Sequence, residues 1–150
     1  MIALHVNEEF KGLFSEEKLH MAALAVFAQQ NKPHDTMITI VISDDEQLHQ
    51  LNQQFLGENR TTDVLSFPSG EIDPETQQQY LGDIIISFPQ AKKQAAASGH
   101  DVEDELQLLV VHACLHLLGF DHSSEQEKKD MWAAQKEILN LLGVHTNLME

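Results

Sequence analysis

Three histidines in one apolar segment constrain the fold more than any other feature of this chain. His112, His116 and His122 lie in the sequence VHACLHLLGFDH. Leucine and valine residues at helical spacing predict a largely buried helix over Val102–Leu118. Residues four apart lie one turn apart on the same face of a helix, so the imidazoles of His112 and His116 can converge on one ion. Burial of such a helix fixes the rotamers of both rings.

Gly119 allows a third histidine to join the first two. Glycine adopts a left-handed conformation without a Cβ clash, and a helix that ends in this conformation reverses the chain. The segment after Gly119 can therefore return His122 toward His112 and His116. Three neutral imidazoles leave a fourth coordination position open for water, as in catalytic zinc sites. We predict one Zn²⁺ ion here; Ni²⁺, Co²⁺ and Cu²⁺ also suit these ligands. The alternative is a set of hydrogen-bonded core histidines.

Residues near this motif are predicted to have structural or supporting roles. Cys114 points about 200° away from His112 on a helical wheel, which places it in the core. Met131 is also predicted to lie in the core. Asp121 either accepts the free N–H of a ligand imidazole or caps the following helix. The other histidines are predicted to be surface or packing residues: His5, His20, His34, His49, His100 and His145.

The size and composition of the chain favour a single domain over residues 1–150. A chain of 150 residues with 42% hydrophobic content is long enough to enclose a buried site in one core. Its only cysteine excludes an internal disulfide, and the N-terminus has no signal-peptide pattern. No apolar run approaches the roughly 20 residues of a membrane-spanning helix. These features predict a cytoplasmic protein.

The charge of the chain limits how it can bind nucleic acid. Nine Lys and Arg residues against 24 Asp and Glu residues give a formal net charge of −15. Broad, sequence-independent phosphate binding requires many basic side chains that face the strand. Any contact with RNA must therefore be local, and DNA is not an expected partner.

The pattern of strands and helices predicts an α+β fold. It indicates a small mixed sheet of about four strands, packed with about five helices. The strands are expected at Ile2–Val6, Met37–Ser43, Thr62–Phe67 (closed by Pro68) and Tyr80–Phe88, with a polar hairpin or excursion between the last two. The helices are expected at Ser15–Gln30, from Asp44 or Asp45 to Phe55, at Pro89–Ser98, at Val102–Leu118, and from Ser123 or Ser124 to about Leu142.

The spacing of the histidines is also that of a group of zinc peptidases. The pattern H-x3-H-x2-G-x2-H occurs in metzincins, whose first histidine is followed by a glutamate that acts as general base. In this chain that position is Ala113, which cannot take a proton from water. If the protein is a hydrolase, the base is a metal-bound hydroxide, another side chain or a group on the substrate.

Three segments resemble the signatures of the YbeY family of bacterial metallo-endoribonucleases. The segment HACLHLLGFDH is similar to the family's metal-binding signature, LNQQFLGENRTTDVLSFP to its second signature, and YLGDIIIS to its G-D-I-x-I strand. The resemblance covers essentially the whole chain. It implies a zincin-like fold in which His112, His116 and His122 hold a zinc-type ion.

The resemblance also implies a function and its partners. Members of this family cleave single-stranded RNA, act in the maturation of the 3′ end of small-subunit ribosomal RNA, and take part in ribosome quality control. The expected partners are therefore single-stranded or ribosomal RNA and the small ribosomal subunit or its proteins. The acidic surface would suit docking onto basic ribosomal proteins. A zinc-dependent peptidase-like hydrolase and a non-catalytic, metal-stabilised ribosome-assembly factor stay open as alternatives.

Two positions depart from the family pattern. Ala113 replaces a glycine, a small change that leaves room for the ion. An arginine that the family places after L-N-x-x-F falls on Leu56. Arg60, the only arginine in the chain, is predicted to take over the catalytic role, since a guanidinium can grip a phosphate through two hydrogen bonds and offset its developing charge. The nucleophile is either metal-activated water or the 2′-hydroxyl of the RNA.

Overall fold

A mixed β-sheet forms the centre of the molecule. The computed structural model describes residues 2–57 and 62–144, and within these ranges the sheet has four strands in the order β1-β2-β4-β3. The strands are β1 (Ile2–Val6), β2 (Met37–Ser43), β3 (Val64–Ile72) and β4 (Gln79–Ser87). β1, β2 and β4 are parallel, and β3 is antiparallel to β4. The predicted mixed sheet is confirmed.

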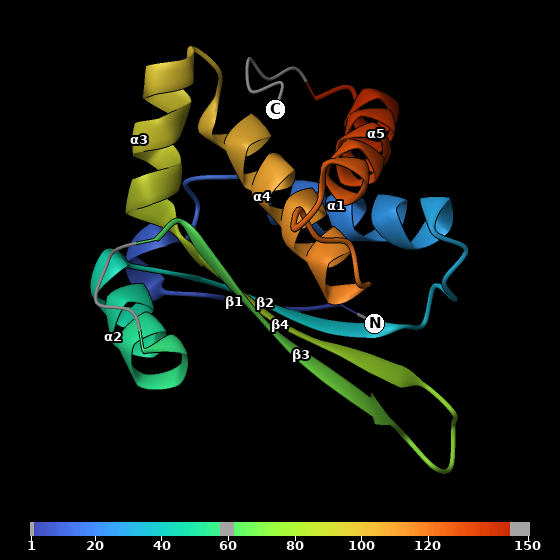
Figure 1. Cartoon of the computed structure of the whole chain (residues 1–150). Coiled ribbons are helices and arrows are strands. Elements are labelled where there is room, and N and C mark those ends of the chain that lie inside the picture. The colour runs from blue at the N-terminus through green and yellow to red at the C-terminus, as the bar shows by residue number, and fades with distance from the viewer. Residues whose placement is uncertain (1, 58–61, 145–150) are drawn as a thin grey trace.

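Helices cover both faces of this sheet (Figure 1). They are α1 (Glu16–Gln29), α2 (Asp45–Leu56), α3 (Phe88–Ser98), α4 (Val102–Leu117) and α5 (Glu125–Leu142), with a short 3₁₀ turn at Glu8–Phe10. Alternate side chains of the central strands point to opposite faces. Ile84 and Ile86 pack into the main core with α1, α4 and α5, whereas Ile85 packs against Leu48 of α2. The α+β prediction with five helices is thus confirmed over the described part of the chain.

The helix ends follow the capping residues in the sequence. Ser15, Asp44 and Ser124 each accept a hydrogen bond from the backbone N–H three residues later, as N-cap side chains do. Of the two serines considered for the last helix, Ser124 is therefore the cap. Gly99 and Gly143 end α3 and α5 with positive φ angles, as expected for glycine at a helix C-terminus. None of the helices in the described ranges is long and apolar enough to cross a membrane.

The prediction that Pro68 closes the third strand is wrong. β3 continues through Pro68 to Ile72 and forms a long hairpin with β4. β3 lies at the edge of the sheet, where a residue without an N–H group is tolerated, and the register shifts between Pro68 and Glu71. The segment predicted as a hairpin or excursion is therefore a hairpin, whose turn is closed by a bond from Asp73 N to Gln78 O.

Gly82 is required where the two strands of this hairpin approach each other. Its φ is +144°, and a Cβ atom there would lie 2.2 Å from the carbonyl oxygen of Phe67. We expect Gly82→Ala to lower the free energy of unfolding by about 2–4 kcal/mol, because backbone rather than a flexible side chain would have to move. Urea unfolding followed by circular dichroism measures this. Gly70→Ala is the matched control, with positive φ but nothing within 4 Å, and should cost about 1 kcal/mol. Equal losses would refute the steric argument.

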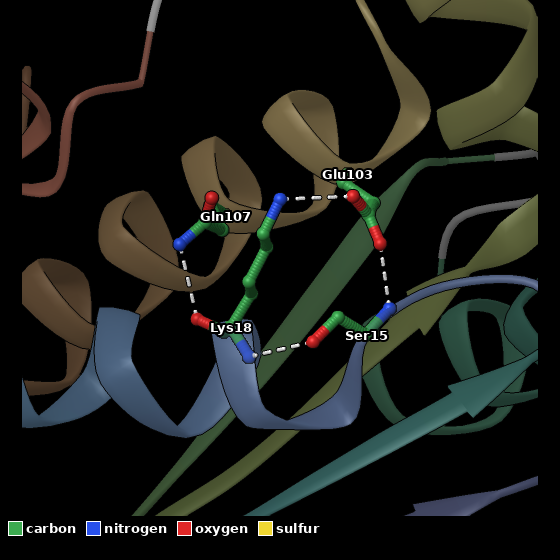
Figure 2. Close-up of polar contacts among 4 residues, drawn as sticks. All are labelled: Ser15, Lys18, Glu103 and Gln107. Carbon is green, nitrogen blue, oxygen red and sulfur yellow. Dashed lines mark hydrogen bonds and ion pairs between the residues drawn. The ribbon is translucent and has the colours of Figure 1, made fainter.

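Polar contacts fix the N-terminal half of α4 to the start of α1. Glu103 of α4 accepts a 2.7 Å bond from the backbone N–H of Ser15 and pairs at 3.0 Å with Lys18 (Figure 2). The Lys18 bond, helped by that N–H, lowers the pKa of the Glu103 carboxyl. One turn on, Gln107 donates to the backbone carbonyl of Lys18 at 3.1 Å. These bonds hold α4 in place over the core, so the orientation of its C-terminal half is set as well.

Candidate metal centre

The three histidines of the motif meet at the C-terminal end of α4. His112 and His116 project from the same face of this helix, and His122 comes from the loop before α5. Their ring centroids are 4.7 Å (His112–His116), 4.8 Å (His116–His122) and 5.6 Å (His112–His122) apart. One potential ligand atom of each ring lies within 4.8 Å of the other two. The loop therefore brings the third imidazole to the pair on the helix.

Gly119 makes this return of the chain possible. Its N–H bonds to the carbonyl of His116 at 3.0 Å, and the N–H of Phe120 bonds to that of Leu115 at 3.0 Å. This pair of bonds is a Schellman motif, with Gly119 at the position that takes a positive φ, here +106°. Phe120 then packs against the main core. The turn is thus fixed by backbone bonds and by one apolar side chain, and His122 follows it directly.

Two hydrogen bonds orient the ligand rings of α4. Nδ1 of His116 lies 2.9 Å from the carbonyl oxygen of Phe120, which can only accept, so this nitrogen carries the proton. Nδ1 of His112 lies 2.9 Å from Oε1 of Gln135 on α5, an amide oxygen that also accepts. In both rings Nε2 is left with its lone pair, and the two Nε2 atoms face each other at 3.2 Å. Two facing lone pairs are stabilised by a cation that both can bind.

Burial keeps the two helix-borne histidines in their ligand form. Desolvation lowers the pKa of His112 below its usual value, and the nearby His116 and His122 lower it further. Desolvation is also the main cause of the lowered pKa of His116. A neutral imidazole is the form that binds a metal ion. At neutral pH both rings are therefore ready to coordinate without first losing a proton.

The separations of the ligand atoms fit one transition-metal ion. Two nitrogens bound tetrahedrally at the usual Zn–N distance lie about 3.4 Å apart, close to the 3.2 Å between His112 and His116. The remaining pairs are within 4.8 Å, and they involve His122, which is exposed on its loop. Coordination by all three rings would require the imidazole of His122 to lie closer to the other two. The donor set and its tautomers suit zinc or a similar ion.

Two hollows meet at the histidine cluster. The first has a volume of about 710 Å³ and lies between α3, α4, α5 and the start of β3, with His112 and His122 in its wall. The second has a volume of about 560 Å³ and lies between α2, β3 and the end of α4, with His112 and His116 in its wall. A ligand larger than either hollow can therefore contact the cluster from both sides.

Most of the other residues singled out in the sequence lie in the second hollow or in the core. Ala113 is buried and lines the second hollow, where it offers no acid or base. Leu56 lines the same hollow. Arg60 lies outside the described residues, so its catalytic role stays a prediction. Cys114 and Met131 are fully buried, as predicted, and burial raises the pKa of the Cys114 thiol to about 12.

Asp121 plays neither of its two predicted roles. Its carboxylate accepts bonds from the backbone N–H of His122 and from the hydroxyl of Ser123, and these bonds lower its pKa. Asp121 therefore organises the loop that carries the third histidine. The ring N–H groups of His112 and His116 are instead held by Gln135 and by the carbonyl of Phe120. The sequence does contain a signal for Gln135. It is a polar residue four positions after Met131, so it lies on the same face of α5 as this buried side chain.

We expect the bond from Gln135 to matter for metal affinity. Gln135→Leu removes the acceptor of His112 Nδ1–H, so the ring can turn and change tautomer, and Zn²⁺ affinity should fall about 10- to 100-fold. Competition with a chromogenic chelator measures this without an activity assay. Gln135→Glu keeps an acceptor and should bind within about fivefold of wild type. Unchanged affinity in Gln135→Leu would show that the bond does not support the ligand.

Known proteins resemble this chain over nearly its whole length. The family profile described as Endoribonuclease YbeY matches residues 5–143, which include all three histidines. A protein named Endoribonuclease YbeY from Shouchella clausii is 38% identical, with 96% of this chain and 97% of that protein covered. Another of that name, from Geobacillus thermodenitrificans, is 41% identical over 85% of this chain and 86% of its own. The solution structure of TM1509 from Thermotoga maritima is 26% identical, with a TM-score of 0.63 over 95% of this chain and 89% of that one.

Proposed function

The chain belongs to the YbeY family, and from this premise we propose that it is a metal-dependent endoribonuclease that hydrolyses phosphodiester bonds in single-stranded RNA. One structural observation supports this proposal independently of the names of the relatives. The three histidines, two half-buried and the third exposed, line the walls of two adjoining hollows, where an RNA strand can lie across them. A closed structural metal site would lack such access.

Each residue of the candidate metal centre has a proposed role in the reaction. His112, His116 and His122 would hold the ion, which would supply an acidified water and polarise a phosphoryl oxygen. Gln135 and the Phe120 carbonyl keep the two helix-borne rings in the ligand tautomer. The exposure of His122 leaves one side of the cluster open to a phosphate. We infer zinc as the ion, because three neutral imidazoles with an open position are typical of catalytic zinc.

We place this activity in the cytoplasm, in the maturation of ribosomal RNA. The family relationship supports a role at the 3′ end of small-subunit RNA and in ribosome quality control. The net charge of −15 supports recognition through proteins of the small subunit, whose basic surfaces would attract it, rather than through broad contact with RNA phosphates. The specificity for an RNA cleavage position would then come from the place where the protein docks on the small subunit, as well as from its own metal centre.

A peptidase activity is the less favoured alternative. Its general base would occupy the position of Ala113, which lines the second hollow without a titratable group. The purified protein should be incubated separately with a labelled single-stranded RNA, its double-stranded form and an unfolded protein. We expect cleavage of the single-stranded RNA alone. Cleavage of the unfolded protein, or of no substrate at all, would refute the proposal in favour of a peptidase or of a metal-stabilised assembly factor.

Arg60 is the residue that we propose to stabilise the charge on the phosphate. Arg60→Ala should lower kcat for RNA cleavage about 100-fold, the usual cost of losing one charged donor to a transition state. Metal content should not change. Leu56 lines the second hollow beside His116, so Leu56→Arg in the Arg60→Ala background should recover at least part of the lost activity. Activity within twofold of wild type in Arg60→Ala would remove Arg60 from the mechanism.

A further inference from the structure

The first hollow contains an aromatic surface beside the candidate metal centre. Trp132 of α5 is half-buried and lines this hollow, one turn before Gln135, the residue that bonds His112. The ammonium of Lys128 lies over one face of the indole, 4.7 Å from the ring centroid, and Lys128 lines the hollow as well. An aromatic face with a cation beside it is the usual way in which proteins hold single-stranded nucleic acid without reading its sequence.

The wall of the hollow is largely apolar and includes a few polar side chains. Asp63 lies at the start of β3, and Glu105 of α4 pairs at 2.6 Å with His100. Gln94 of α3 adds an amide to the same wall. Glu105 is buried and its carboxyl is occupied by His100, which leaves Asp63 as the accessible carboxylate of this wall. A carboxylate repels a phosphate, but it accepts hydrogen bonds from the amino and imino groups of a nucleobase. The lining therefore favours a base in the hollow and keeps the phosphate outside it.

The size and position of the hollow agree with this assignment. A volume of about 710 Å³ lies within the range of small-molecule sites and is enough for a base with its ribose. His112 and His122 form part of the wall, so a base in the hollow is attached to a phosphate that reaches the histidine cluster. The first hollow and the histidine cluster are therefore continuous. A surface depression elsewhere on the molecule would not adjoin the cluster.

We propose that the first hollow binds the base of a nucleotide adjoining the cleaved phosphodiester bond, with the indole face of Trp132 that Lys128 does not cover as its stacking surface and Lys128 as the contact for the neighbouring phosphate. The inference rests on the proposed endoribonuclease function and deepens it. Such a subsite explains a preference for single strands, because only an unpaired base can leave its neighbours and enter the hollow. Stacking on the indole admits any base, whereas hydrogen bonds to Asp63 and Gln94 favour a base that offers donors to them.

Trp132 is the only tryptophan in the chain, so its fluorescence reports directly on this hollow. A 2′-O-methyl RNA hexamer should be titrated into the full-length protein, next to a matched hexamer whose bases are all absent. We expect the first to quench the tryptophan fluorescence by at least half, with the same midpoint as binding measured by anisotropy. We expect the abasic hexamer to leave the fluorescence unchanged. Equal quenching by both, or no quenching by either, would overturn the proposal.

Two variants separate stacking from a general effect of mutation. Trp132→Leu should raise KM for single-stranded RNA about tenfold and leave kcat within twofold. Trp132→Phe keeps an aromatic face and should keep KM within twofold to threefold of wild type. An unchanged KM in the leucine variant, or an equal rise in both, would contradict the assignment. Quenching without cleavage by the wild type would refute the nuclease function and support the base site, whereas cleavage without quenching would refute the base site alone.

Discussion

Replacement of His116 by alanine is expected to remove the metal ion and to lower RNA cleavage by roughly a thousandfold or more. His116 is the central histidine of the cluster, with Nε2 3.2 Å from that of His112 and its ring 4.8 Å from that of His122. Two ligands on their own hold a zinc ion weakly, and without the ion the site loses the acidified water that the ion would supply. Metal analysis of the purified variant and an RNA cleavage assay measure the two losses.

The control for this variant is a histidine far from the cluster. His34 is exposed in the loop between α1 and β2, and His34→Ala should retain both the metal and the activity. The circular dichroism spectrum of His116→Ala should match that of wild type, because the ring is only half-buried at the end of α4. If His116→Ala retained the ion and its cleavage rate, the three histidines would not form the metal centre. If it lost stability while the wild type cleaved nothing, the site would be structural.

Gly119→Ala should weaken metal binding without touching any ligand. An alanine at φ +106° costs about 1–2 kcal/mol, although no atom lies within 4 Å of its Cβ. In the metal-free protein the loop can relieve this strain by moving, which takes His122 away from the pair on α4. Metal binding must then restore the strained turn, so Zn²⁺ affinity should fall about 5- to 30-fold. Chelator competition gives this value.

Gly143→Ala offers a matched comparison for this effect. Gly143 ends α5 in the same Schellman motif, with φ +72° and bonds from its own N–H to Asn140 and from that of Val144 to Leu139. Its replacement should cost similar stability and leave metal affinity unchanged. If Gly119→Ala lost stability but bound Zn²⁺ as wild type does, Gly119 would serve only to end the helix.

Much of this architecture was predictable because the decisive signals are local. The short 3₁₀ turn at Glu8–Phe10 was not predicted. Serine and aspartate N-caps, glycine at helix ends and β-branched strands predicted each α-helix and strand of the described chain to within a few residues. The exception is β3, whose proline is tolerated only because the strand lies at the edge of the sheet. The order of the strands depends on contacts between distant segments of the chain, so it could not be predicted from any one segment.

The histidine triad was predictable for the same reason, and its surroundings were not. The spacing of His112 and His116 and the glycine between the second and third histidines are features of one short segment. Gln135 reaches His112 only because α5 packs across α4 at one register, and the two hollows exist only between packed elements. Asp121 shows the limit of local reasoning, since it binds the loop backbone although it lies next to a ligand.

Reconstitution of the metal-free protein tests the central claim most directly. The protein should be stripped with a chelator, titrated with Zn²⁺, and assayed at each step on a labelled single-stranded RNA. We expect the stripped protein to be inactive and cleavage to return in proportion to the ion, reaching its maximum at one equivalent per chain. Full cleavage by the stripped protein, or no cleavage after one equivalent has bound, would show that the three histidines do not carry out the reaction proposed for them.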